Sequence, residues 1–195
     1  MLRTQPSLKG RTVVVDRSGP VRRTSGGLEG AGDCKRCAAL CCMALAFDTA
    51  QGFGIDKPNG VACPNLGNND QCTIHANRCR EGFSSCVTFD CGGVGQYVTE
   101  TVFARARWRD DPALTDPMTT AFSTVREIAA LTEMVDVALA LDLTDADRAV
   151  LADHRESLWP DTPWTPASLA AFADADTAGQ IRASLRRLRR YFADL

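Results

Sequence analysis

Residues 34–45, CKRCAALCCMAL, place four of the chain's nine cysteines within nine positions. A thiolate is a soft ligand that holds zinc, cuprous copper or iron–sulfur clusters, and a Cys-x-x-Cys turn presents two sulfurs that one metal ion can bridge. Cys34 and Cys37 have this spacing. The stretch therefore predicts a metal site, and we expect that site to decide the fold of the segment around it.

The motif continues with the adjacent pair Cys41 and Cys42, whose side chains are expected to face different ways. Cys41 lies four residues beyond Cys37, which is one turn if AALCC is helical, so these two sulfurs can face the same centre. Cys42 then points elsewhere. The pair indicates either two neighbouring metal ions or one ligand beside a cysteine that is not a ligand.

Cysteines further along the chain supply more ligands. One tetrahedral zinc ion takes four ligands, so this inventory could fill two closed sites or one larger cluster. The predicted metal ligands are Cys34, Cys37, Cys41, Cys42, Cys63, Cys72, Cys86 and Cys91. Two residues stay open: Cys79, which suits the role of a small buried apolar residue equally well, and His75, which has Cys-x-x-His spacing from Cys72.

The composition and the N-terminal residues indicate a cytoplasmic protein. The net charge of −2 gives no overall attraction to nucleic acid or to an anionic membrane, and no run of about 18 apolar residues predicts a membrane span. The first 27 residues lack the continuous apolar stretch of a secretory signal. In a reducing compartment, cysteine-rich patterns are more often metal-binding or redox-active than disulfide-bonded.

Loop signals and short alternating runs predict the fold of the first half of the chain. Residues 1–33 read as a flexible leader in which only TVVV, at 12–15, resembles a strand. Residues 34–109 hold every cysteine, and YVTETVFARARWR, at 97–109, alternates as a strand or hairpin would. We therefore expect a small irregular α+β domain stapled by metal over residues 34–109.

An all-α helical module is predicted over residues 117–195. Apolar spacing indicates helices at 117–141 and 145–158, and the second begins after Thr144. Thr165, followed by proline, opens a third helix. Its apolar stripe consists of Ile181, Leu185, Leu188 and Phe192.

The charges of this helical module are segregated. Residues 110–176 hold fourteen acidic and three basic side chains, whereas 182–190 holds five arginines and no acid. Such polarity suits contact with a protein better than contact with duplex nucleic acid, which needs a broad basic surface. A protein partner is therefore expected to bind through this module, and nucleic acid is disfavoured.

Several motifs in order resemble a known family. CKRCAALCCMAL, ACPNL, CTIHANR and CVTFDC are similar to the bacterial CxxCxxCC, or YkgJ-type, zinc- or iron-chelating cysteine-cluster proteins. CPNL, CTIH, GFSSC and FDCGGVGQ most resemble the cysteine-rich leader that precedes pentapeptide repeats in some bacterial proteins. The resemblance covers about residues 33–97 and implies metal chelation. Three residues, AAL, separate Cys37 from the double cysteine here, whereas the family usually has two, and no pentapeptide repeats follow residue 97.

These patterns together predict a metal-binding accessory or regulatory protein. Zinc is the expected metal, because closed multi-thiolate zinc sites commonly stabilise short loop-rich segments, and iron or an iron–sulfur cluster is the alternative. A redox enzyme with a reactive thiol at Cys42 or Cys79 is the first alternative function. The second is a binding module for nucleic acid or protein. No GxSxG, HExxH or paired catalytic carboxylate motif is present.

Overall fold

The computed structural model describes residues 22–24, 27–29 and 32–192. Within them the α-helices are α1 (Leu40–Ala44), α2 (Ser84–Thr88), α3 (Val94–Tyr97), α4 (Thr115–Leu139), α5 (Asp145–Leu158), α6 (Pro166–Asp174) and α7 (Thr177–Arg187). Shorter 3-10 turns are η1 (Cys34–Arg36), η2 (Thr49–Gln51), η3 (His75–Asn77), η5 (Pro112–Leu114) and η6 (Leu188–Phe192), and η4 (Val98–Val102) is π-helical. The strand predicted at 12–15 lies outside the described residues.

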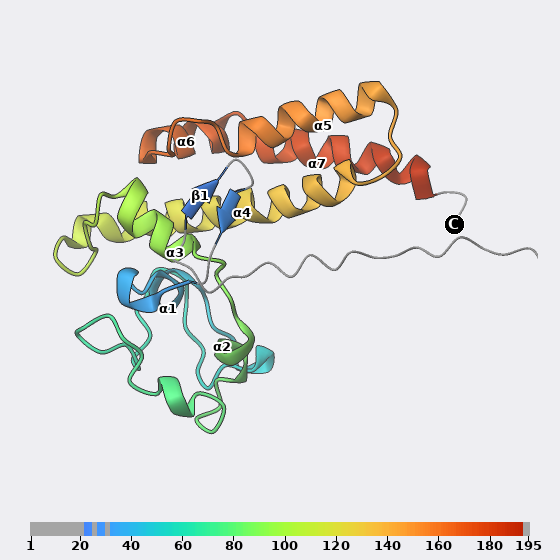
Figure 1. Cartoon of the computed structure of the whole chain (residues 1–195). Coiled ribbons are helices and arrows are strands. Elements are labelled where there is room, and N and C mark those ends of the chain that lie inside the picture. Colours follow the sequence, from blue (N-terminus) through green and yellow to red (C-terminus); the bar gives the residue numbers. More distant parts are fainter. Residues whose placement is uncertain (1–21, 25–26, 30–31, 193–195) are drawn as a thin grey trace, which may run out of the picture.

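Helix α4 is the central element of the fold. Figure 1 shows α5, α6 and α7 along one side of α4, and α1, α2 and the loops between them on the other. The residues of α4 that are buried at helical spacing include Met118, Phe122, Val125, Ile128, Leu131 and Val135. One hydrophobic core therefore runs from Ala38 and Leu40 of the cysteine-rich segment to Leu188 near the end of the chain.

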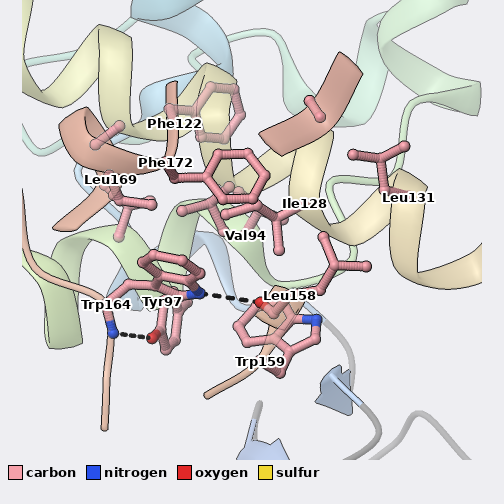
Figure 2. Packing of buried hydrophobic residues seen from close by; sticks show 14 of the residues in the cluster. Val94, Tyr97, Phe122, Ile128, Leu131, Leu158, Trp159, Trp164, Leu169 and Phe172 are labelled. Carbon is pink, nitrogen blue, oxygen red and sulfur yellow. Dashed lines mark hydrogen bonds between the residues drawn. The ribbon is translucent and has the colours of Figure 1, made fainter. Parts of the chain in front are cut away.

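Aromatic side chains, among them Tyr97, Trp159 and Trp164, pack against one another in this core (Figure 2). The Trp164 backbone amide donates to the Tyr97 hydroxyl at 3.1 Å, and the Trp164 indole donates to the Leu158 carbonyl at 3.2 Å. Trp159 packs edge-on against Tyr97 with ring centroids 5.6 Å apart. The Trp159 indole donates to the Thr132 hydroxyl at 2.8 Å, so both indoles and the Tyr97 hydroxyl have a partner and the aromatic rings can be buried without an unpaired polar atom.

Local signals place the helix ends well. The Thr144 side chain accepts from the Asp147 amide at 3.3 Å, so α5 begins as predicted, and α4 begins and ends two residues before its predicted limits. Thr165 and Ser168 form a reciprocal capping box at the start of α6. The single third helix was wrong: the chain breaks between α6 and α7 at Asp176, whose φ of 49° is left-handed.

The expectation of a metal-stapled α+β domain was also wrong. The described strands are β1 (Arg22–Thr24) and β2 (Gly27–Glu29), an antiparallel hairpin with Arg23 opposite Leu28, and both precede the first cysteine. The described part of residues 34–109 consists of short helices, turns and two isolated bridges. Within the described ranges, no three His, Cys, Asp or Glu side chains are grouped closely enough to hold a metal ion. Short helices, two hydrophobic clusters and hydrogen bonds hold this region instead.

The strand or hairpin predicted at 97–109 is helical where it begins. Val94, Tyr97 and Val98 are buried at helical spacing, and α3 continues directly into η4. The Thr99 hydroxyl donates to the Gly95 carbonyl at 2.8 Å, one turn back. The alternating pattern was misleading because β-branched residues here pack against α4 from a helix, a case of tertiary context overriding propensity.

No helix among the described residues combines the length and the apolar character that a membrane crossing requires.

Candidate functional site

A cavity of about 520 Å³ lies among the short helices and loops of residues 32–91, against α3 and Phe122 of α4. Its walls include all eight of the predicted ligands, Cys34, Cys37, Cys41, Cys42, Cys63, Cys72, Cys86 and Cys91. His75 also lines it, whereas Cys79 does not and is exposed. All nine cysteines are free thiols. The fold therefore brings together residues up to 57 positions apart in the sequence, from 34 to 91.

The first cysteine loop is tied to the helical core by side chains of α3 and η4. The Asp33 amide donates to the buried Gln96 at 3.3 Å, and the Ala38 amide donates to the Thr99 hydroxyl at 3.0 Å. The Trp108 indole donates to the Ala38 carbonyl at 2.7 Å. These bonds satisfy backbone groups that form no hydrogen bond within a helix or sheet. They fix the path of the chain on both sides of Cys34 and Cys37.

Glycine allows α3 to approach this loop. A Cβ atom at Gly95 would lie 2.7 Å from Cys37 Sγ, which is closer than a real Cβ contact allows. Gly93, the residue before α3, has a φ of 82°, a left-handed conformation that glycine adopts without steric cost. The glycine-rich CGGVGQ therefore serves close packing beside Cys37 and Cys91, as a tight turn would.

Helix α1 directs its two cysteines toward different surroundings. Cys41 packs against the main core, together with Cys37 and Cys91. Cys42 packs instead against a second, smaller cluster built on Phe47, Cys63 and Phe83, as does Cys86. Successive helical residues point about 100° apart, which is the reason for this divergence. The two thiols still lie within hydrogen-bond reach of each other, and this bond contributes to the raised pKa of Cys41, so Cys42 does not point fully away from Cys41 as expected.

The later cysteines reach the cavity through local backbone bonds. The Cys63 amide donates to the Cys42 carbonyl at 3.0 Å, and a β-bridge pairs Leu66 with Cys72. The Gln71 side chain donates to the Cys34 carbonyl at 3.1 Å. The two halves of the cysteine motif are therefore joined by hydrogen bonds that leave the sulfur atoms unused.

Two cations stand beside the thiols. Lys57 is 5% exposed, and its Nζ donates to the carbonyls of Met43 (3.3 Å), Leu45 and Pro58 (3.1 Å) at the end of α1 and the loop that follows it. Burial lowers the pKa of Lys57, and the charge of Cys63 acts in the opposite direction. Arg78 lines the cavity and donates to the Cys86 carbonyl at 2.7 Å.

Asp70 anchors the loop that precedes Cys72. Its side chain is 5% exposed, and it accepts from both Arg107 and Arg109, with the Arg109 Nε at 2.6 Å from a carboxylate oxygen. Arg109 also donates to the Gly67 carbonyl at 3.1 Å and stacks over Trp108. This ion pair fastens the cysteine loops to the segment that leads into α4.

Burial raises the pKa of several cavity thiols further above neutral pH. It raises the pKa of Cys37 to about 12 and that of Cys86 to about 11, with further upward contributions from neighbouring cysteines, Cys41 among them. Burial likewise raises the pKa of Cys34 and Cys63. The pKa of Cys41 is raised first by its hydrogen bond with Cys42 and then by burial.

Sequence reasoning found the cysteines and missed the residues that support them. The spacing of thiols is a recognisable signal, whereas Lys57 and Asp70 occur in none of the quoted motifs, and Arg78 and Gln96 end the motifs CTIHANR and FDCGGVGQ without an expected role. Lys57 lies in a loop, and Asp70 has a φ of 59°, a left-handed conformation that Asp adopts more readily than most residues. They become functional candidates only through their contacts with the loops that carry the cysteines.

Comparison with known proteins gives one relative without an assigned activity. The chain is 32% identical over 111 residues to the uncharacterized protein YybG of Bacillus subtilis (strain 168). The match covers 57% of this chain and 40% of YybG, so the chain spans well under two thirds of that relative. No family model and no solved structure matches the chain. The resemblance to the CxxCxxCC family stays a prediction.

Proposed function

We propose that the cavity lined by eight cysteines binds thiophilic metal ions, and that the protein acts as a metal-binding accessory or regulatory protein. The observation that supports this function is the convergence on one cavity of all eight predicted ligands as free thiols. Thiolates favour zinc, cuprous copper and iron–sulfur clusters over hard cations. A reducing compartment such as the cytoplasm would keep these thiols available.

The donor set fits a metal by its chemistry. The thiols line the walls of the cavity and are not gathered at one point among the described residues, so metal binding would draw them inward. Each metal-bound sulfur must lose its proton, and the nearby ammonium of Lys57 and guanidinium of Arg78 would offset part of the resulting negative charge.

Zinc is the metal that we propose. Sites closed by four thiolates are typical of structural zinc, and the cavity offers enough thiols for such closure. An iron–sulfur cluster is the alternative that the test below distinguishes.

The test compares metal content in two variants of the full chain. We expect anaerobically purified protein to hold zinc, and a Cys37→Ser/Cys41→Ser variant to hold less per chain by elemental analysis. Cys79→Ser is the matched control, because Cys79 is exposed and lies outside the cavity. Unchanged metal content in the double variant would sink the assignment. A brown preparation with matched iron and sulfide would replace zinc by an iron–sulfur cluster.

A further inference from the structure

The two adjacent cysteines of α1 form a thiol pair at the wall of the cavity. Cys41 and Cys42 both line the cavity, and the Cys41 thiol is hydrogen-bonded to the Cys42 thiol. Both residues are half-buried, so a small molecule in the cavity can reach them. Among the described residues no three His, Cys, Asp or Glu side chains are grouped for a metal ion. This place in the cavity therefore offers a ligand two thiols, not three or four.

Hydrogen bonds of the backbone hold this thiol pair in place. The Cys42 amide donates to the Ala39 carbonyl at 2.9 Å, and the Cys42 carbonyl accepts from the Cys63 amide at 3.0 Å. The buried ammonium of Lys57 donates to the Leu45 carbonyl, at the C-terminal end of α1. A ligand that needs the two thiols side by side therefore spends little of its binding free energy on ordering them.

Aromatic side chains stand on both sides of the pair. Cys42 packs against the cluster that contains Phe47, and Phe53 stacks on Phe47 with ring centroids 4.4 Å apart. Cys41 packs against the main core, from which Phe122 reaches the cavity. The cavity of about 520 Å³ lies within the range of about 300–1,000 Å³ that is typical of small-molecule sites. The site therefore fits a ligand that joins a soft, thiol-binding atom to an apolar group.

We propose that Cys41 and Cys42 bind trivalent organic arsenicals, with the organic group of the ligand among the aromatic side chains of the cavity. Trivalent arsenic is soft, and an organic arsenical already has one carbon ligand, so two thiols complete its three bonds. Two arsenic–sulfur bonds form, the arsenic–oxygen bond breaks, and both thiol protons leave with that oxygen as water. Arsenic stays trivalent, so the step needs no oxidant or reductant. This inference goes beyond the proposed metal-binding function, because it uses two of the eight thiols and no metal ion.

The charge of the product also fits the cavity. The hydrogen bond with Cys42, together with burial, raises the pKa of Cys41 well above the ordinary value of a thiol, so this thiol enters the reaction with its proton. Because both thiol protons leave in the water molecule, the bound arsenical is neutral. An apolar cavity accepts a neutral adduct without the cost of burying a charge.

The place of the organic group is tested by Phe53→Ala, because Phe53 is half-buried and lines the cavity. We expect this variant to hold phenylarsine oxide about tenfold more weakly against a competing dithiol, and methylarsonous acid within about twofold of the unsubstituted chain. Val61→Ala is the control, since Val61 is exposed and does not line the cavity. Equal weakening of both arsenicals by Phe53→Ala, or of neither, would overturn the placement of the organic group.

Phenylarsine oxide tests the thiol pair in the full-length, reduced protein. In excess glutathione, each chain is expected to gain one phenylarsenic group in place of two thiol hydrogens, by intact mass spectrometry. Cys41→Ser and Cys42→Ser should each abolish this gain, because both thiols are needed. The controls Cys79→Ser and Cys34→Ser/Cys91→Ser should bind as the unsubstituted chain does. Binding that survives in Cys41→Ser and in Cys42→Ser would overturn the inference.

The pair can also be mapped without any substitution. After phenylarsine oxide binds, the other thiols are alkylated, a dithiol removes the arsenical, and the freed cysteines are labelled and located by peptide mass spectrometry. The label is expected on Cys41 and Cys42, and a label on other cysteines would overturn the assignment. Zinc content of the same preparation separates the two proposals. A chain that holds zinc and binds no phenylarsine oxide overturns this inference alone, and the reverse result overturns the metal-binding function alone.

Discussion

The helical region and the cysteine-rich region of this chain are held together in different ways. The first consists of α4 to α7, whose apolar faces bury one another, and α5 and α6 begin with side-chain caps from residues three positions away. The second consists of short helices and loops whose backbone groups are satisfied by side chains more than 60 positions away, such as Gln96, Thr99 and Trp108. Apolar burial sets the first region, and long-range polar contacts set the path of the second.

The difference shows what each region can tolerate. A helix that buries an apolar stripe tolerates changes on its exposed face, because its stability comes from packing. A loop fastened by a few hydrogen bonds depends on each of them, because a lost partner leaves a polar group unsatisfied. Substitutions in the two regions should therefore differ in how their effects spread.

The largest effect is expected at Phe122, where the two regions meet. Phe122 is fully buried on α4 and also lines the cavity, so Phe122→Ala removes packing from both sides. We expect the free energy of unfolding to fall by about 3–5 kcal/mol. Urea denaturation followed by circular dichroism measures it. Val137→Ala on the same helix is the control, because Val137 is 70% exposed and should change stability by less than about 0.5 kcal/mol. Equal losses in the two variants would contradict the packing described for α4.

An intermediate effect is expected at Asp70, in the cysteine-rich region alone. Asp70→Asn removes the charge that Arg107 and Arg109 bind, and these partly exposed arginines can then be hydrated. We expect a loss of about 2 kcal/mol, within the range for hydrogen bonds to charged groups. Limited proteolysis should cut residues 67–109 sooner than α4 to α7. Glu81→Gln is the matched control, since its ion pair with Arg80 is exposed and 4.0 Å long. Faster cleavage throughout the helices would show that the regions are not distinct.

The smallest effect is expected at Asp147, at the start of α5. Its carboxylate accepts from Tyr191, Arg190 and Thr144, and these bonds lower its pKa to about 2. An Asp with a lowered folded-state pKa contributes stability above its unfolded-state pKa of about 3.9 and loses it as the pH falls toward 2. Asp147→Asn should therefore flatten the pH dependence of the melting temperature between pH 4 and 2, by differential scanning calorimetry. An unchanged slope of melting temperature against pH would show that Asp147 does not contribute this pH-dependent stability.

The elements that the sequence predicted well are those whose causes are local. Helix α5 begins after Thr144 as expected, because its cap and its apolar spacing lie within one short segment. The break at Asp176 and the helical start of residues 97–109 were missed, because both depend on packing against α4, which adjacent residues do not reveal. Tertiary contacts also decided the failure of the α+β expectation.

The candidate site, too, could be predicted from the sequence only where the signal is local. The eight cysteines could be named from their spacing alone, and they do line one cavity. Lys57 could not be named from the sequence. Its ammonium is buried against three backbone carbonyls, and these belong to Met43 and Leu45 on one side of a loop and to Pro58 on the other. A residue that supports a ligand carries no spacing signal, since its partners are fixed only once the chain has folded.

The placement of the three tryptophans gives each region its own optical probe. Trp159 and Trp164 are buried in the helical core, whereas the half-buried Trp108 donates its indole proton to Ala38, the residue after Cys37. Fluorescence from Trp108 therefore samples the thiol loop, and fluorescence from the other two samples the helices. Events at the cavity and events in the helical core can thus be followed separately by the light that one protein emits.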